Sequence, residues 1–361
     1  MTGAAVDPAV RRAREVVGLY GDTDLTWSIM LTLRLADPLQ GDQVVERLVE
    51  LVRAYPDLGR QPELVRVGPD ELNGIEEGFA NTPYGDHDPL VRVALGDDGR
   101  DLVVAMHHGA GDGLGMLGVA AVVTGLPLTT GARGIERNSE PHNFVSRSVQ
   151  RVLEALLRPP ARFAPSGTEG QPGDHLRHSW GSAGKVNTAS LVSATVAALR
   201  DWNRTRDPSR RGRRVVVSMG LSRRPGTPTP TPTRDTAFAR FRADRIWSAQ
   251  DAREVMRGVE PEPEFPARAE PGLVGRAVKV LEGRLGATVL VSNLGLIDHP
   301  GVTRARLWPA PAGPAGVAVG LVGTRSGTGV TLRVRRGWFG PTEVDELLTM
   351  VVDQLRANPG Q

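Results

Sequence analysis

Apolar and polar positions in the first half of the chain follow two periods. Residues 26–35 (TWSIMLTLRL) alternate in part and residues 102–106 are apolar throughout, which predicts strands. Helical spacing of apolar side chains predicts helices over residues 43–54 and 114–123. The elements expected in this half are helices over 8–19, 43–54, 114–123 and 145–157 and strands over 26–35, 63–67, 90–95 and 102–106. A turn at residues 96–99 (GDDG) joins the last two strands as an antiparallel hairpin.

The second half mixes the same two patterns. It is preceded by residues 159–185, which are rich in Gly, Pro, Ser and Ala and lack a clear period, so we expect the boundary between two lobes there. The elements expected beyond it are helices over 188–202 and 341–357, strands over 214–219, 238–242, 288–292, 315–322 and 330–335, and an extended, polyproline-like segment over 227–233. The pattern indicates an α+β fold, with lobes over residues 1–160 and 188–361 and a connecting segment over 161–187.

Composition narrows the class of protein. The chain has 361 residues, of which 40% are hydrophobic, enough for a large core and about two domains. It has no cysteine, which excludes disulfides, a thiol nucleophile and cysteine-ligated metals and fits a reducing cytoplasm. The first residues lack the apolar core of a signal peptide, and no apolar run is long enough to span a bilayer. We therefore expect a cytoplasmic protein with no membrane partner.

Charge points to no particular partner. The formal net charge is +3, and all but two of the 44 basic residues are arginine, since Lys185 and Lys279 are the only lysines. Together with the Ala, Gly and Pro content, this bias is typical of a GC-rich genome. Aromatic residues make up only 4% of the chain, and no helix-turn-helix, finger or aromatic RNA-binding signature is present. We expect no nucleic-acid partner.

Residues 102–118 (LVVAMHHGAGDGLGMLG) carry the candidate chemistry. His107 and His108 end an apolar strand, and adjacent strand residues point to opposite faces, so only one ring can face a given cavity. Three nearly side-chain-free residues follow, which lets a ligand or another backbone approach closely. Asp112 stands where a helix N-cap belongs. A base beside the N–H groups of a helix start would stabilise a substrate oxygen that gains negative charge, which suggests acyl transfer.

Other interpretations of this stretch remain. Paired histidines at a strand end are often hydrogen-bonded core residues. A metal site from His107, His108 and Asp112 is disfavoured because adjacent strand histidines diverge. Residues 113–118 also match the G-x-G-x-x-G dinucleotide pattern, but six loop residues separate them from the strand and no acidic residue ends a following strand. We therefore expect Gly115 and Gly118 to allow close helix packing.

Residues 107–113 (HHGAGDG) resemble the His-His-x-x-x-Asp-Gly signature of the CoA-dependent acyltransferase superfamily. This superfamily includes chloramphenicol acetyltransferase, nonribosomal peptide condensation domains, polyketide-associated acyltransferases and wax ester synthases. The surroundings are similar as well: the hairpin before the histidines, VVVSMGLSRR at 215–224, VLVSNLGLID at 289–298 and the final strand and helix. The resemblance therefore covers nearly the whole chain.

The resemblance implies two chloramphenicol-acetyltransferase-like lobes, each a mixed sheet with flanking helices, arranged as a V around a central tunnel. Carried over by position, His108 is the base that takes a proton from the acceptor, and His107 is mainly structural. Asp112 orients the loop through an arginine, for which Arg223 is the candidate. Gly113 presents its backbone N–H to the carbonyl.

Two residues of the second lobe complete the implied site. Ser292 and Asn293 correspond to positions that line the tunnel, where their side chains could bind the tetrahedral intermediate or the acceptor. The chain departs from the plant branch of the superfamily, because the Asp-Phe-Gly-Trp-Gly motif is absent and Gly337-Trp338 lacks the neighbouring residues. It is also short for a condensation domain, which suggests a more open tunnel.

The sequence thus predicts a stand-alone, condensation-like acyltransferase. It would move an acyl or aminoacyl group from a phosphopantetheine thioester, on CoA or on an acyl- or peptidyl-carrier protein, to a small amine or alcohol, forming an amide or ester in natural-product biosynthesis of the nonribosomal peptide type. No permanently bound cofactor and no metal are expected. The alternative is a non-catalytic docking protein that keeps the fold and binds a carrier protein or partner enzyme.

Overall fold

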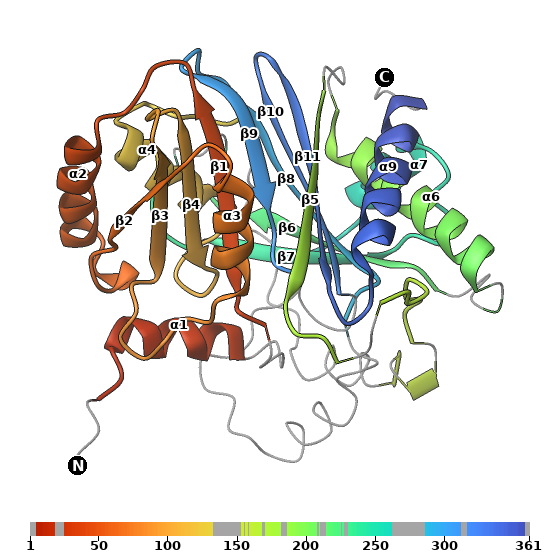
Figure 1. Ribbon diagram of the computed structural model, residues 1–361. Helices are drawn as coiled ribbons and strands as arrows, with labels where there is room; N and C mark the ends of the chain where they lie inside the picture. The colour runs from red at the N-terminus through yellow and green to blue at the C-terminus, as the bar shows by residue number, and fades with distance from the viewer. Residues whose placement is uncertain are drawn as a thin grey trace.

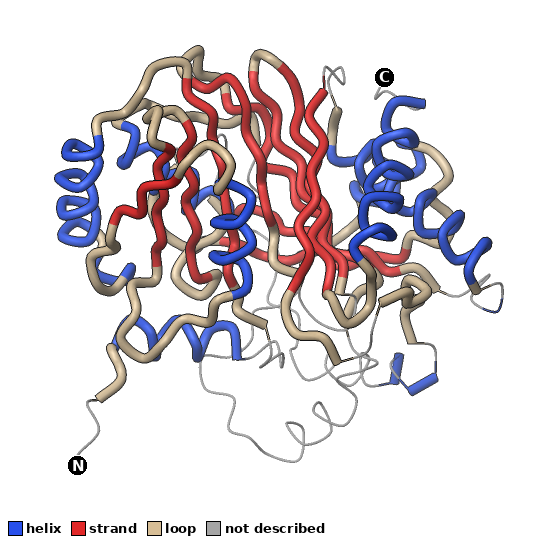
Figure 2. Tube along the Cα trace, viewed as in Figure 1, coloured by secondary structure: helices blue, strands red, loops and turns tan. Residues whose placement is uncertain are grey.

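The computed structural model describes residues 5–18, 25–132, 153–154, 156–157, 159–167, 170–181, 186–207, 209, 214–224, 226, 230–261, 286–311 and 316–357. Two mixed β-sheets with flanking helices make up this part of the chain (Figures 1 and 2). The expected α+β fold is therefore confirmed. None of the helices in these ranges is long and apolar enough to cross a membrane.

The first sheet has the strand order β2-β3-β4-β1-β9. Its strands are β1 (Ser28–Leu35), β2 (Leu64–Val67), β3 (Val91–Gly96), β4 (Asp101–His107) and β9 (Val302–Trp308). The helices around it are α1 (Pro8–Gly18), α2 (Gly41–Ala54), α3 (Leu72–Asn81) and α4 (Gly113–Thr124), with a short 3₁₀ turn at Pro56–Leu58. Odd positions of β1 pack with α2 and α4, whereas the even position Met30 packs with α3, so the sheet is covered on both faces.

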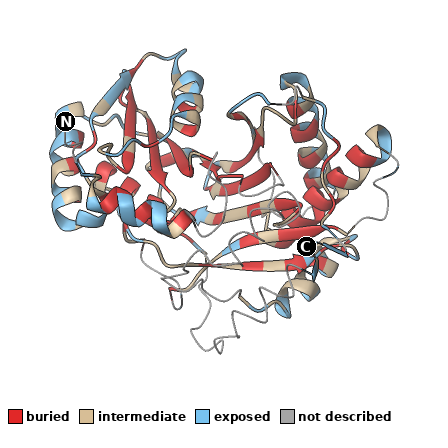
Figure 3. Cartoon of the chain, turned by 90° about the horizontal axis from the view of Figure 1, so that it is seen from below, coloured by how far each residue is buried: buried red, intermediate tan, exposed pale blue. Residues whose placement is uncertain are grey.

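The second sheet has the order β5-β11-β10-β8-β6-β7, with β8 parallel to both β10 and β6. Its strands are β5 (Asp174–Gly181), β6 (Val216–Ser222), β7 (Thr236–Arg242), β8 (Val289–Ile297), β10 (Val317–Thr324) and β11 (Gly327–Arg335). Helices α6 (Thr188–Arg206), α7 (Ala249–Arg257) and α9 (Pro341–Ala357) share one large apolar core with this sheet. Figure 3 shows buried residues concentrated in the strands and on the inner faces of the helices.

The two sheets meet along β9, which comes from the second half of the chain but pairs antiparallel with β1 of the first. Glycines in β10 and β11 let these strands of the second sheet approach the backbone of β9. A Cβ atom at Gly320 would lie 2.1 Å from the carbonyl oxygen of Leu307, and one at Gly329 would lie 2.2 Å from that of Ala305. Side chains larger than hydrogen at these two positions would force the sheets apart.

Helix α4 shows a second close approach. It carries apolar residues on all sides, which is typical of a buried helix. A Cβ at Gly115 would lie 2.2 Å from the carbonyl oxygen of Thr233, and one at Gly118 would lie 2.6 Å from the carbonyl carbon of Thr231. The prediction that these glycines serve close helix packing is confirmed, and the partner is the chain that leads into β7.

Most expected elements form within a few residues of their predicted ends, but four were not expected: α3, β5, α7 and β9. Most of the helix expected over 145–157 and part of the extended segment over 227–233 lie outside the described residues. The division into residues 1–160, 161–187 and 188–361 stays a prediction. Two strands cross it, because β5 pairs with β11 and β9 pairs with β1.

Candidate active site

The two histidines lie on opposite sides of the backbone at the end of β4. His107 is the last residue of the strand and His108 the first of the turn that follows. The ring of His107 contacts Tyr84 edge-on, with centroids 5.1 Å apart. The ring of His108 lies 6.4 Å from that of Trp27 and 6.3 Å from that of Phe238. The divergence predicted from the strand period is confirmed.

His107 supports the turn. Its side chain is buried, and its Nδ1 atom accepts a hydrogen bond of 3.1 Å from the N–H of Gly109. The proton of the neutral ring therefore lies on Nε2. Burial, with smaller contributions from His108, Arg14 and Arg92, lowers the pKa of His107 to about 3. The ring is neutral at neutral pH and acts as an acceptor within the turn.

His108 presents the opposite tautomer. Its Nδ1 atom lies 3.0 Å from the carbonyl oxygen of Gly111. A carbonyl can only accept, so Nδ1 carries the proton and Nε2 of the neutral ring keeps its lone pair. Burial lowers the pKa of His108, partly offset by this hydrogen bond. The ring therefore stays unprotonated at neutral pH, which is the form that a general base requires.

The glycines between the histidines and Asp112 allow tight packing. A Cβ at Gly109 would lie 2.0 Å from the carbonyl oxygen of Ala13 in α1. A Cβ at Gly111 would lie 2.3 Å from the Cε atom of Met106. The close approach of another backbone, which the sequence predicted as one possibility, is thus realised by α1.

Asp112 is the N-cap of α4, as predicted, and accepts from the N–H of Gly115 at 2.7 Å. It is also a junction to the second sheet. The N–H of Asp235 and the hydroxyl of Thr236 donate to its Oδ2 atom at 2.8 and 2.6 Å. Burial alone would raise the pKa of Asp112, but Arg224 and these hydrogen bonds lower it below its usual value. The carboxylate is therefore ionised, and both of its oxygens accept hydrogen bonds.

The arginine that binds Asp112 is Arg224, and the prediction of Arg223 was wrong. Nη1 of Arg224 lies 3.1 Å from both carboxylate oxygens, and its Nη2 donates to the carbonyl of Thr233 at 2.7 Å. Along β6, Val217 and Met219 face the helices, so the even positions, continued by residue 224, face Asp112. Arg223 instead extends the ladder, its N–H donating to the carbonyl of Asp235 at 2.9 Å.

Gly113 is the first residue of α4, and its N–H belongs to the group that a helix leaves without an intrahelical acceptor. A Cβ added to it would lie 3.6 Å from Leu294 in β8. This contact brings the part of β8 that contains Ser292 to the start of α4. Ser292 is half-buried and pairs in register with Gly320.

Asn293 is held by local contacts. Its amide nitrogen donates to the hydroxyl of Thr188, at the start of α6, at 3.0 Å. Its carbonyl oxygen accepts from the N–H of Gly295, which has a φ of 83°, at 2.8 Å. These bonds fix the bend at which β8 passes from one lobe core to the other, since Val291 packs in the second core and Leu294 in the first.

Two aromatic neighbours of His108 were missed at the sequence level. Trp27 has a φ of 55°, the only positive value among non-glycine residues in the described ranges. Its carbonyl accepts the N–H of His108 at 2.7 Å. A bulky residue in this region is strained by about 1–3 kcal/mol and is held there by its surroundings. Phe238 reaches His108 from β7, and neither contact leaves a signal in the local sequence.

In the described part of the chain, no three His, Asp or Glu side chains gather as ligands for a metal ion. Residues 107–113, which we call the histidine corner, carry groups that can perform proton transfer. The histidine corner combines an imidazole with a free Nε2 lone pair, the start of a buried helix, and a carboxylate that ties this start to the other sheet. A substrate oxygen beside the N–H of Gly113 would gain hydrogen bonding as its negative charge grows.

Comparison with known proteins shows which solved structures share this fold. No protein-family model matches the sequence, and no curated protein does so. Among solved structures, the chain is similar to the starter condensation domain of rhizomide synthetase, in complex with C8-CoA and Leu-SNAC (12% identity, TM-score 0.64, 99% of this chain and 95% of that chain). It is also similar to the first condensation domain of the calcium-dependent antibiotic synthetase (16%, 0.63, 99% and 97%).

A third similar structure is an NRPS cyclization-docking bidomain from Sorangium cellulosum (14% identity, TM-score 0.55, 99% of this chain and 86% of that chain). All three matches extend over nearly the whole chain, so the likeness is not confined to one lobe. At these identities the likeness concerns the fold. The chain has the two-lobed, CoA-acyltransferase-like fold of nonribosomal peptide condensation domains.

Proposed function

We propose that the protein is a condensation-like acyltransferase in which His108 is the general base. The observation that carries this proposal is the hydrogen bond from Nδ1 of His108 to the carbonyl of Gly111, which leaves Nε2 as an acceptor at the start of α4. Burial keeps the ring unprotonated near neutral pH. The substrates belong to the proposal: an acyl or aminoacyl thioester of CoA or a carrier protein as donor, and an amine or hydroxyl as acceptor.

The reaction divides into two steps. Nε2 of His108 takes the proton of the acceptor as its nitrogen or oxygen forms a bond to the thioester carbonyl carbon. The carbonyl oxygen becomes an oxyanion, which the N–H of Gly113 stabilises. The carbonyl bond then re-forms, the carbon–sulfur bond breaks, and the thiolate leaves with the proton from Nε2. The products are an amide or ester and a free thiol, and His108 returns to its starting state.

Asp112 and Arg224 contribute to the reaction by positioning the start of α4. The carboxylate caps α4 and binds Arg224, so it fixes the helix start relative to the second sheet. Asp112 is not a proton donor or acceptor in the reaction, because its lone pairs are already engaged. Ser292, beside the same helix start, belongs to the proposed lining of a tunnel between the lobes through which donor and acceptor reach His108. Asn293 fixes the bend of β8 next to it.

The test is mass spectrometry of reaction mixtures. Wild type and His108→Ala are incubated with panels of acyl-CoA and acyl-carrier thioesters together with amines and alcohols. We expect an amide or ester from wild type and at least about a hundredfold less from His108→Ala, the usual contribution of a general base.

His299→Ala is the matched control. His299 lies at the β8–β9 turn, where its Nδ1 accepts from the N–H of Gly301 at 3.0 Å, and we expect normal turnover from this variant. Equal turnover by His108→Ala and wild type would refute the proposed base. Absence of product from every mixture, with a carrier protein still bound, would favour the docking protein instead.

A further inference from the structure

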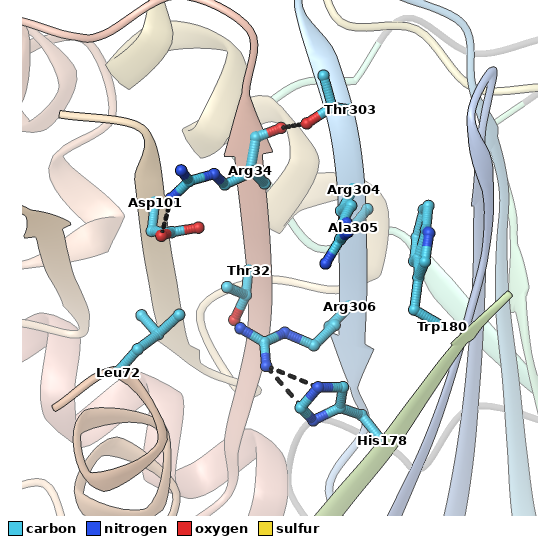
Figure 4. Close-up of a pocket in the computed structure, with 10 residues that line it drawn as sticks. All are labelled: Thr32, Arg34, Leu72, Asp101, His178, Trp180, Thr303, Arg304, Ala305 and Arg306. Atoms are coloured by element: carbon cyan, nitrogen blue, oxygen red, sulfur yellow. Dashed lines mark hydrogen bonds and ion pairs between the residues drawn. The ribbon is translucent and has the colours of Figure 1, made fainter. Parts of the chain in front are cut away.

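A second cavity lies away from the histidine corner. It has a volume of about 580 Å³, and Figure 4 shows the ten residues that line it: Thr32, Arg34, Leu72, Asp101, His178, Trp180, Thr303, Arg304, Ala305 and Arg306. They come from β1, β4 and β9 of the first sheet, from β5 of the second, and from α3. Thr32 and Arg34 are even positions of β1, on the face covered by α3, whereas α4 covers the other face. The cavity is therefore separate from the proposed active site.

The sheet register places in this cavity an arginine that has no ion-pair partner of its own among the described residues. Arg34 and Arg304 are directly opposite each other in the β1–β9 pair. The charge of Arg34 is met by Asp101 and by Asp98, whose carboxylate lies 3.0 Å away. Arg304 is exposed and has no ion-pair partner within the described ranges. Because Asp98 and Asp101 already pair with Arg34, the guanidinium of Arg304 remains available to an anion from solution.

Arg306 provides a second guanidinium, held in a fixed position. It is two residues from Arg304 on the same strand face, which places the two Cα atoms about 7 Å apart. Glu76 lies 3.3 Å from its Nη2 atom, and the ring of His178 lies 3.2 Å from its Nη1 atom. Glu76 is in turn bound by Thr32 and by the indole N–H of Trp308. The guanidinium is thus ordered before any ligand arrives and keeps further N–H donors available.

An aromatic side chain lines the β5 side of the cavity. Trp180 of β5 contributes a half-buried indole ring there, and Leu72 of α3 lies at the other end, with Arg304 and Arg306 between them (Figure 4). An indole favours stacking with a flat ring of a ligand. The volume lies within the range of pockets that bind small molecules, about 300–1,000 Å³. The cavity therefore combines guanidinium groups and an indole ring within a volume suited to one small molecule.

We propose that this cavity binds a small organic anion built on a flat ring, with the anionic group on Arg304 and Arg306 and the ring against Trp180. Guanidinium groups bind phosphate and carboxylate in the same bidentate manner, so either group satisfies the chemistry. A nucleoside monophosphate and an aromatic carboxylic acid are the two sources. Binding gives Arg304 an anionic partner and is independent of the acyl transfer proposed above.

The test is titration calorimetry at low salt with adenosine monophosphate and with indole-3-carboxylate as probes. Adenosine supplies the flat ring without the anionic group, and inorganic phosphate supplies the anionic group without the ring. We expect one of the two ring anions to bind at least about tenfold more tightly than adenosine or phosphate, and the stronger probe identifies the source. Absence of binding by both ring anions, or binding of phosphate as tightly as the stronger of the two ring anions, overturns the proposal.

Variants connect the binding to the cavity. Arg304→Ala removes the exposed guanidinium and is expected to weaken binding at least about tenfold, the usual effect of losing a charge-assisted hydrogen bond. Trp180→Leu is expected to weaken the ring anions but leave phosphate unchanged. Arg257→Ala, an exposed arginine on α7, is the matched control and is expected to bind as wild type. Unchanged binding by Arg304→Ala, or equal weakening by Arg257→Ala, refutes the site. His108→Ala should bind normally, which separates this proposal from the proposed reaction.

Discussion

His107 and His108 carry the same side chain in adjacent positions, and their surroundings give them opposite hydrogen-bonding roles. Nδ1 of His107 accepts from a backbone N–H, whereas Nδ1 of His108 donates to a backbone carbonyl. The strained backbone of Trp27 contributes to this difference, because its carbonyl holds the N–H of His108. Local hydrogen bonds thus select the residue whose Nε2 lone pair is free.

The buried, neutral His107 makes stability depend on pH. Its pKa is lowered from 6.5 to about 3 by burial, so between these values the unfolded chain binds a proton that the folded chain does not. The free energy of unfolding therefore falls as pH decreases through this window, by ~2 kcal/mol for this residue at pH 5. We expect urea titrations at pH 7 and pH 5 to show a loss of at least this size. The loss should be ~2 kcal/mol smaller in His107→Asn, and an identical loss in that variant would contradict the assignment.

In helix α4, the chain that packs on the helix restricts which residues it can contain. Alanine is a better helix former than glycine by about 1 kcal/mol, so α4 would be more stable by itself without Gly115 and Gly118. The chain at residues 231–233 leaves no room for a Cβ at either position. That chain also carries Thr233, which binds Arg224, the partner of Asp112. Packing on α4 is therefore coupled to the position of the N-cap.

Glycine-to-alanine substitutions separate propensity from packing. Gly115→Ala places a Cβ 2.2 Å from a carbonyl oxygen and is expected to lower the free energy of unfolding by about 1–3 kcal/mol. Gly78→Ala in α3 meets nothing within 4 Å, lies on the exposed side, and is expected to raise it by about 0.5–1 kcal/mol. Chemical denaturation of both variants measures the contrast. Equal changes of the same sign in the free energy of unfolding would show that the contact with Thr233 does not restrict the residue at position 115.

The elements that the sequence did not reveal share a physical cause. Helix α3 contains Gly74, Gly78 and two asparagines, so its propensity is low, and packing of Phe79 and Ala80 on the sheet stabilises it. Strand β5 has a polar pattern because it lies at the sheet edge. The pairing of β9 with β1 is a long-range contact that no local period encodes. Likewise, the motif predicts His108 and Asp112 as site residues, but the choice of Arg224 over Arg223 as the partner of Asp112 depends on strand parity in another lobe.

At the scale of the whole molecule, contacts between the lobes lie on both sides of the histidine corner. Asp112 binds Arg224 on one side. On the other, Arg333 of β11 is fully buried and reaches across to the first lobe, where it donates to the carbonyls of Ser28 and Ala80. Ser28 follows Trp27, whose carbonyl holds His108. The contact of Arg333 with the first lobe is therefore next to the backbone that holds His108.

Arg333 is the contact whose removal should reveal this coupling. Its Nε atom donates to the buried carboxylate of Asp174 at 2.7 Å, so Arg333→Met leaves that charge and the carbonyl of Ser28 without this partner, whereas the carbonyl of Ala80 keeps the hydroxyl of Thr26. Breaking a buried pair in this way costs about 3–5 kcal/mol. We expect a loss of that size in the free energy of unfolding, together with a lower rate of the proposed acyl transfer.

Arg325→Met is the matched control, because Arg325 pairs with Asp298 at the surface, where both side chains are more than half exposed. An exposed pair contributes about 0–1 kcal/mol, so this variant should unfold nearly as wild type does. Replacing both members of the buried pair, in Arg333→Met with Asp174→Leu, should recover part of the stability, because no unpaired charge remains. It should not recover the transfer rate, since Ser28 and Ala80 still lack the guanidinium. Recovery of both together would show that Arg333 balances the charge of Asp174 but does not position His108.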